Sequence, residues 1–137
     1  MTLGHPIIMG RRTFEIAKPD IYKGSKKLRV VITKKPNEYR ELEVPGRLKF
    51  TNKHPKQIVS ELEKQGFKQA LLVGGSGINA LFFKDKLIDE VWITIEPKIF
   101  GRGNNLIANL NLDVQLKLES LKKLNGKGTL LLKYKVL

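Results

Sequence analysis

The chain has 137 residues, of which 41% are hydrophobic and 28% are charged, a balance typical of one globular domain and not of a disordered segment. It contains no cysteine, which excludes disulfide bonds and thiolate metal sites. No apolar run approaches the roughly 18 residues that a membrane-spanning helix needs, and the first residues carry no signal-peptide pattern, so we expect a cytoplasmic protein.

The net charge of +13 arises from 26 Lys and Arg residues against 13 Asp and Glu residues, and the basic residues are spread along the chain. Proteins that bind nucleic acid more often concentrate such residues on one arm or interleave them with exposed aromatic residues. We therefore expect no specific nucleic-acid partner. A nucleic-acid-binding α/β module remains an alternative that depends on charge alone, whereas a basic surface also helps to attract an anionic small molecule.

The first half of the chain alternates short apolar runs with helical patterns. We expect a strand over residues 6–10, and then a short helix with Thr13 as its N-cap. That helix should end near Lys18, because Pro19 disfavours helical geometry in the residue before it. A turn over 22–25 precedes a second expected strand over 28–32, and a polar loop over 38–47 precedes a third over 48–50.

The second half predicts further strands and a hairpin. Pro55 opens a helix that Gly66 ends, residues 71–73 form a strand, and a helix follows a cluster of glycines. A strand is expected over 90–95, and Asn125-Gly126 between two apolar runs indicates a hairpin. The pattern predicts one domain over residues 1–137 with a three-layer α/β fold, whose mostly parallel sheet carries a C-terminal antiparallel hairpin.

The glycine cluster Gly74-Gly75-Ser76-Gly77 is a candidate phosphate site. Glycines allow a sharp turn with no Cβ in the way, and the N-terminus of the following helix favours an anion. A tight strand-to-helix turn without a ligand is the alternative. The cluster is not the dinucleotide fingerprint G-x-G-x-x-G, and no acidic ribose partner is evident after it.

Two further strand ends carry residues suited to phosphate. Arg11 and Arg12, with Thr13, follow Gly10 at a helix N-terminus, where two cations are poorly placed unless an anion binds there. Thr33 and Lys34 end the second strand, where a hydroxyl and an ammonium group suit a phosphate monoester such as the 2′-phosphate of NADPH. Solvated surface side chains are the alternative at both places.

These three sites support one another, because the carboxyl ends of parallel strands meet at one edge of a sheet, where ligands bind. Other chemistry is not indicated. His5 and His54 each precede a proline and are not spaced as metal ligands, so we treat them as loop residues and expect no metal site. No Ser-His-Asp arrangement can be argued.

Segments 6–15, 31–33, 73–77 and 92–94 resemble dihydrofolate reductases and their relatives in order and spacing. Within that superfamily, segment 95–107 and the closing hairpin are more similar to the reductase domain of the bifunctional riboflavin-biosynthesis deaminase-reductases. The resemblance covers nearly the whole chain. It implies a homodimeric, NADPH-dependent oxidoreductase that transfers a hydride to a ribosylaminopyrimidine phosphate in riboflavin biosynthesis. Dihydrofolate reduction, and a catalytically silent or truncated nucleotide-binding domain, are the alternatives.

The resemblance also implies roles for particular residues. It implies a cis peptide bond between Gly74 and Gly75, and a substrate-facing position for Thr94. Asn79 departs from the family, which often has an aromatic residue there. The implied cofactor-binding residues are Gly10, Arg11, Arg12, Thr13, Thr33, Lys34, Val73, Gly74, Gly75, Ser76, Gly77 and Ile78.

The start of the chain departs most from the family. Relatives have about one strand, a loop and a helix before the segment that matches Pro6, whereas only residues 1–5 precede it here. In dihydrofolate reductases that lead segment supplies the acidic residue that assists protonation, and its strand lies inside the sheet. We expect its absence to leave open backbone groups and exposed apolar surface. The carboxylates Glu15, Asp20, Asp89 and Glu96 each have an ordinary structural explanation, so no catalytic acid is assigned.

Overall fold

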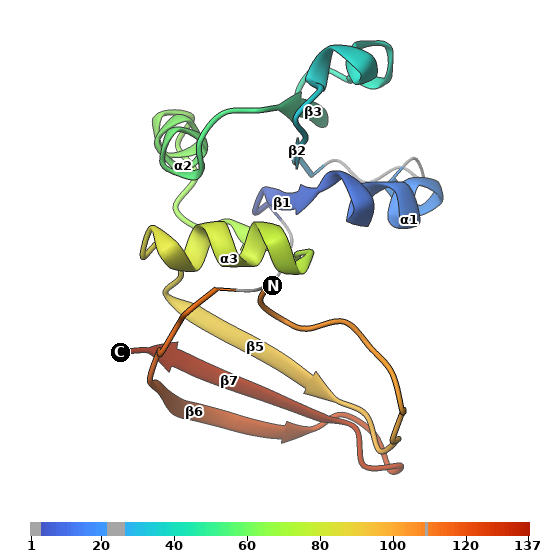
Figure 1. The fold of residues 1–137 in the computed structure, drawn as a ribbon, viewed down its shortest axis with the longest axis vertical. Helices are drawn as coiled ribbons and strands as arrows, with labels where there is room; N and C mark the ends of the chain where they lie inside the picture. Colours follow the sequence, from blue (N-terminus) through green and yellow to red (C-terminus); the bar gives the residue numbers. More distant parts are fainter. Residues whose placement is uncertain (1–3, 22–26, 109) are drawn as a thin grey trace.

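The computed structural model describes residues 4–21, 27–108 and 110–137 and contains two sheets (Figure 1). Strands β1 (Ile7–Gly10), β2 (Arg29–Ile32), β3 (Leu48–Thr51) and β4 (Leu71–Leu72) form a parallel sheet in the order β3-β2-β1-β4. Strands β5 (Glu90–Ile95), β6 (Leu116–Lys123) and β7 (Leu130–Val136) form an antiparallel sheet in the order β5-β7-β6. The parallel α/β sheet and the antiparallel hairpin are confirmed, but the expected single sheet is divided in two.

The parallel sheet is covered on both faces, which confirms the three layers. Because successive side chains of a strand point to opposite faces, neighbouring residues of β1 pack into different cores. Met9 packs with Phe14 of α1 (Arg11–Ile21), beside the 3-10 helix η1 (Pro36–Leu42). Ile8 packs on the other face with residues of α2 (Pro55–Lys64) and α3 (Ser76–Lys84).

Helix α1 is longer than the sequence predicted. It begins at Arg11, directly after β1, and continues past Pro19 to Ile21, so the expected N-cap at Thr13 and the expected end near Lys18 are wrong. Phe14 is fully buried against the sheet, and such tertiary packing stabilises a helix more than local propensity does. The turn expected over residues 22–25 lies outside the described residues.

The structure tests the expected loop position of His54 and the expected hairpin at Asn125-Gly126. His54 is the N-cap of α2, because its Nδ1 accepts the backbone N–H of Lys56 at 3.4 Å and its own N–H donates to the Gln57 side chain at 3.1 Å. His54 is therefore more than a loop residue. The hairpin turn is confirmed, since the side chain of Asn125 accepts the backbone N–H groups of Lys127 and Thr129.

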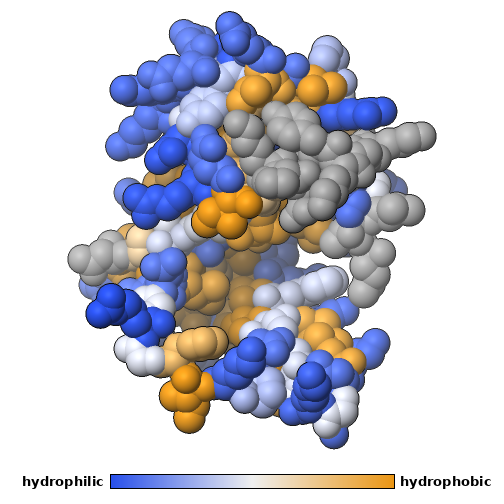
Figure 2. Space-filling model, turned by 90° about the vertical axis from the view of Figure 1, so that its right-hand side faces the viewer, coloured by the Kyte–Doolittle hydropathy of each residue, from blue (hydrophilic) through white to orange (hydrophobic). Residues whose placement is uncertain are grey.

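Helix α3 connects β4 to β5 and lies between the two sheets (Figure 1). Figure 2 shows the surface hollowed at mid-height, with apolar side chains at the bottom of the hollow. No helix in the described ranges is long and apolar enough to cross a membrane.

Candidate functional site

The ends of β1 and β4 are in direct contact. The backbone N–H of Gly10 donates to the carbonyl of Gly74 at 2.7 Å, and the Gly74-Gly75 peptide bond is cis, as the resemblance implied. A Cβ atom at Gly10 would lie 2.8 Å from Cγ1 of Ile78 and 3.6 Å from the backbone nitrogen of Gly75. The packing therefore leaves no room for a side chain at Gly10.

The first turns of α1 and α3 are also adjacent. A Cβ atom at Gly75 would lie 3.8 Å from Oγ1 of Thr13, and both helices begin on the same side of the molecule (Figure 1). Neither first turn contains an acidic residue, and Gly75, the N-cap of α3, provides no side-chain cap. Backbone N–H groups without such a cap favour an anion at a helix N-terminus.

Thr33 and Lys34 lie at the end of the neighbouring strand. Thr33 is buried, its N–H donates to the Thr51 carbonyl at 2.9 Å, and its Oγ1 accepts the N–H of Lys35 at 3.2 Å. Lys34 is exposed. Because β2 lies beside β1 and β1 lies beside β4, the strand order confirms that the three expected sites share one edge of the sheet. Their binding of a cofactor remains a prediction.

The exposed arginines Arg11 and Arg12 add positive charge at this edge. In the part of the chain that the structure describes, no ion pair engages either guanidinium group. Two arginines beside two helix N-termini, without a carboxylate in either first turn, make this edge suited to a ligand with several negative charges.

Asn79 has a role that the sequence did not indicate. Its Nδ2 donates to the carbonyl of Leu106 at 2.9 Å, and the N–H of Ala108 donates to the carbonyl of Ser76 at 3.0 Å. We call residues 104–108 the strap, because these bonds hold it across the first turn of α3. The signal in the sequence is that the polar Asn79 stands between the apolar Ile78 and Ala80, which does not identify its partner.

Other candidates are not brought to this edge by any contact among the described residues. Thr94 is exposed on β5, opposite Leu131 of the antiparallel sheet. Glu15 accepts the hydroxyl of Tyr39 at 3.1 Å, and Glu96 accepts that of Thr129 at 3.2 Å. The side chain of Asp20 is not among those that the structure describes.

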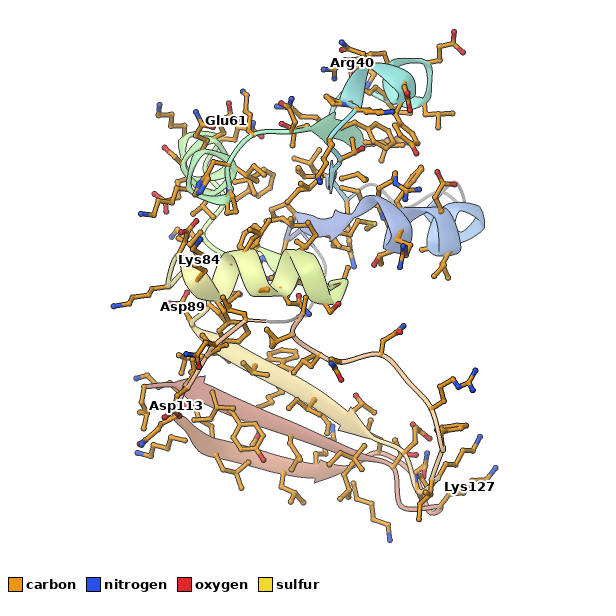
Figure 3. The ribbon with its side chains drawn as sticks, viewed as in Figure 1. Arg40, Glu61, Lys84, Asp89, Asp113 and Lys127 are labelled. Atoms are coloured by element: carbon orange, nitrogen blue, oxygen red, sulfur yellow. The ribbon has the colours of Figure 1, made fainter. Side chains whose placement is uncertain are left out.

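Figure 3 places Asp89 near the far end of α3, close to Lys84 and away from the helix N-terminus. No group of three or more His, Asp or Glu side chains in the described ranges is arranged to hold a metal ion. The edge formed by the ends of β2, β1 and β4 is therefore the candidate site: it combines the glycine backbone, Thr13 and Thr33, and exposed Arg and Lys side chains.

Comparison with known proteins gives a family match over nearly the whole chain. Residues 3–130 match the RibD C-terminal domain. The uncharacterized protein YwjB of Bacillus subtilis is 27% identical over 119 residues, which are 85% of this chain and 66% of YwjB. YyaP of the same bacterium is 27% identical over 122 residues, covering 82% of this chain and 64% of YyaP. The chain thus spans just under two thirds of the length of these relatives.

Solved structures share the fold at low sequence identity. A putative riboflavin biosynthesis protein from Shewanella sp. PV-4 superposes with a TM-score of 0.76 at 22% identity, covering 96% of this chain and 73% of that one. A diaminohydroxyphosphoribosylaminopyrimidine deaminase/5-amino-6-(5-phosphoribosylamino)uracil reductase from Thermotoga maritima gives a TM-score of 0.70 at 16% identity, covering 96% of this chain and 45% of that one.

Proposed function

The chain belongs to the RibD C-terminal domain family, and on that premise we propose that it is a reductase that uses NADPH to reduce a ribosylaminopyrimidine phosphate. The observation that carries the proposal is the contact between the ends of β1 and β4, where the buried Gly10 and Gly74 hold the exposed Gly75 beside two helix N-termini. A side chain at Gly10 would meet Ile78, so this glycine lets the first turns of α1 and α3 lie close together, and at the exposed Gly75 a phosphate-bearing ligand can approach the backbone closely.

The residues at this edge fit two parts of NADPH, its 2′-phosphate and its pyrophosphate. Thr33 and Lys34 would hold the 2′-phosphate, and the N–H groups of the first turn of α3 would hold the pyrophosphate. The remaining proposed contacts come from Gly10, Arg11, Arg12, Thr13, Val73, Gly74, Gly75, Ser76, Gly77 and Ile78. NADPH supplies a hydride when bound. The chain's part is to bind and orient it, and the strap held by Asn79 would limit access of water to the first turn of α3.

The substrate class is inferred from the family and from charge. The Thermotoga maritima protein is named as a reductase of 5-amino-6-(5-phosphoribosylamino)uracil, which carries a phosphate. The net charge of +13 favours the approach of such an anion. Thr94, on the edge of β5, is the residue that we propose to face the substrate.

One observation favours the alternative of nucleotide binding without turnover. Glu15 and Glu96 are already hydrogen-bonded to Tyr39 and Thr129. No described contact brings a carboxylate to the glycine cluster, so a group that could assist protonation is not assigned within this chain.

The test is the loss of NADPH absorbance with 5-amino-6-(5-phosphoribosylamino)uracil or with dihydrofolate as the acceptor. We expect turnover with the aminopyrimidine, and we expect Arg12→Ala to raise the KM for NADPH about tenfold. Lys56→Ala, an exposed lysine on α2, is the matched control and should leave KM unchanged. Turnover of dihydrofolate alone would contradict the substrate, binding without turnover would favour the silent alternative, and failure to bind NADPH would overturn the proposal.

We also propose a homodimer. Strand β6 exposes Leu116, Leu118 and Leu121 by 38%, 49% and 58%, which suits burial against a second copy. Sedimentation velocity should give a dimer that Leu118→Lys converts to a monomer, and a wild-type monomer would contradict it.

A further inference from the structure

Four lysines share one face of the antiparallel sheet. Residues opposite each other in a sheet register lie on the same face, and so do alternate residues of one strand, so the register assigns each side chain to one of two faces. The buried Leu132 and the leucines of β6 lie on one face. We call the other face the lysine face, and exclude from it Thr94, which we propose to face the substrate. The lysine face consists of Lys117, Ser120 and Lys122 of β6, Leu131, Lys133 and Lys135 of β7, and Glu90 and Trp92 of β5.

The lysine face is open to solvent. Its residues are exposed except Leu131 and Lys133, which are half-buried. In the part of the chain that the structure describes, no carboxylate forms an ion pair with any of the four lysines, including Glu90 on the face itself and Glu119 in the β6 bulge. The face therefore presents positive charges that no neighbouring carboxylate neutralises.

The positions of these lysines are unfavourable for the sheet alone. Lys117 lies directly opposite Lys135, and like charges directly opposite each other destabilise a sheet. Lysines on β6, the outer strand on the side away from α3 (Figure 1), have an ordinary role in protecting a sheet edge. Lys133 and Lys135 lie on β7, the central strand, which has no free edge to protect. A bound anion would relieve the repulsion between them.

Trp92, the only tryptophan of the chain, lies beside the lysines. The Nζ atom of Lys133 is 4.0 Å from the centroid of its ring, and its Nε1 donates to the Glu90 carboxylate at 3.1 Å. These two contacts hold the indole in place, yet it remains 44% exposed. Exposed aromatic rings on a basic surface stack on nucleic-acid bases, and such stacking accepts any base because every base has a π-face.

We propose that the lysine face binds single-stranded nucleic acid without sequence preference, with the four lysines on phosphates and Trp92 stacked on a base. Basic residues combined with an exposed aromatic ring are typical of such binders. Along the chain the basic residues are dispersed, and only the register of the sheet brings these four together. The partner is separate from the small molecules of the proposed reaction.

Other polyanions fit this face less well. The bases of a duplex are stacked on each other and not free to stack on Trp92, and the major groove admits a helix or a two-stranded ribbon, whereas this face is three strands wide. A membrane surface requires apolar side chains that enter the acyl region. Among the residues of the lysine face, only Trp92 and Leu131 are of that kind.

The test is fluorescence polarisation of a labelled single-stranded oligonucleotide of about 12 nucleotides, a length within the usual range of site sizes. We expect a slope of log K against log salt of about −3, since each of four phosphate contacts contributes about −0.7. Lys135→Ala should weaken binding about fivefold and bring the slope to about −2. Its Tm should not fall, because the repulsion from Lys117 is removed. Lys56→Ala on α2 removes the same charge elsewhere and should change neither affinity nor slope.

Trp92 gives a second, independent measurement. Because the chain has one tryptophan, its intrinsic fluorescence reports this face alone, and the unlabelled oligonucleotide should quench it. Trp92→Leu should weaken binding at least about fivefold and leave the salt slope unchanged, while Tm shows that the protein remains folded. Saturating NADPH should not displace the oligonucleotide, which separates this face from the edge formed by the ends of β2, β1 and β4.

Several results would overturn the proposal, whatever the outcome for turnover. They are absence of binding at low salt, unchanged tryptophan fluorescence, displacement by NADPH, or equal losses in Lys135→Ala and Lys56→Ala. Equal affinity for a duplex of the same sequence would show that charge alone is responsible. Binding to phosphatidylserine vesicles without binding to the oligonucleotide would assign the face to a membrane surface instead.

Discussion

Gly10 has the least space for a side chain among the glycines of the candidate site, since an added Cβ would lie 2.8 Å from Cγ1 of Ile78. We expect Gly10→Ala to lower the free energy of unfolding by about 1–3 kcal/mol, because overpacking forces the first turn of α3 to move. Urea denaturation measures this loss. In the Ile78→Ala background, where Cγ1 is absent, the same change should cost at least about 1 kcal/mol less. Equal costs in both backgrounds would show that Ile78 is not the limiting contact.

Lys34 tests the proposed 2′-phosphate site. It is exposed at the end of β2, next to Thr33. Lys34→Ala should weaken NADPH binding about tenfold, because one charge-assisted contact to phosphate is lost, and should leave NADH binding unchanged. Isothermal titration with both cofactors measures the two affinities.

Lys35→Ala is the matched control for that experiment. Lys35, the residue before η1, lies 3.8 Å from the carboxylate of Glu38 in an exposed ion pair. We expect it to affect neither cofactor. A parallel loss of NADPH and NADH affinity in Lys34→Ala would contradict the assignment.

Residue patterns indicated which strand ends meet at the candidate site, but not the contacts within it. Gly10, Arg11, Thr33 and the glycine cluster stand out in the sequence because glycine and charge have local meaning. The bond from Asn79 to Leu106 spans 27 residues, so no local pattern indicates it. The capping role of His54 was also missed, because histidine is not among the common N-cap residues.

At the scale of elements, the strap depends on two bonds to the first turns of α3. Asn79→Ala removes the donor to Leu106 and should cost about 0.5–1.5 kcal/mol of unfolding free energy. The N–H of Ala108, which donates to Ser76, should then exchange faster with solvent. Hydrogen exchange read out residue by residue measures this. Unchanged protection at Ala108 would mean that Asn79 does not hold the strap.

Helix α2 has a pH-dependent contact with the loop before it. Glu61, labelled on α2 in Figure 3, pairs with Lys53 and lies 3.7 Å from Lys49. The hydrogen bond from Lys53 lowers the pKa of the Glu61 carboxyl below its usual range, against partial desolvation, and Lys49 lowers it further. A carboxyl with a lowered pKa stabilises the folded state above its unfolded pKa, and this stabilisation is lost as pH falls through the lowered value.

Glu61→Gln should therefore cost about 0.2–1 kcal/mol near neutral pH, the range for exposed pairs, and less at high salt. The cost should disappear in acid below the lowered pKa. Urea denaturation at both pH values measures it, with Glu63→Gln as the control, since no described ion pair involves Glu63. A cost that persists in acid would contradict the role of the charge.

Element types were largely predictable, whereas boundaries depended on tertiary packing. The strand ending at Gly10 and the hairpin at Asn125-Gly126 follow from local signals that the structure confirms. Helix α1 does not follow them, because the burial of Phe14 sustains a helix that passes Pro19. The 3-10 helix η1 overlaps the polar loop expected over 38–47, and it is stabilised by the stacking of Tyr39 on Phe50, whose ring centroids are 4.8 Å apart.

At the scale of the whole molecule, the division into two sheets is the feature that the sequence predicts least well. Strand patterns indicate that β5 is extended, but they do not say which strand lies beside it. Its register with β7, from Glu90 opposite Lys135 to Ile95 opposite Leu130, is a long-range property. The resemblance implied open backbone groups inside the sheet, and among the described strands β4 and β5 each pair on one side only, which agrees with that expectation.

The same architecture brings the three phosphate-binding candidates together. Strands β2, β1 and β4 are neighbours, although their ends lie at Thr33, Gly10 and Gly74, far apart in the chain. The central claim is that one dinucleotide with a 2′-phosphate spans these strand ends.

Amide chemical shifts recorded during titration with NADPH, and then with NADH, test this claim most directly. We predict that the shifts caused by NADPH are concentrated at residues 10–13, 33–34 and 73–78, and that NADH gives the same pattern except at 33–34, with weaker affinity. Shifts confined to the antiparallel sheet, or no shifts with either cofactor, would contradict the account.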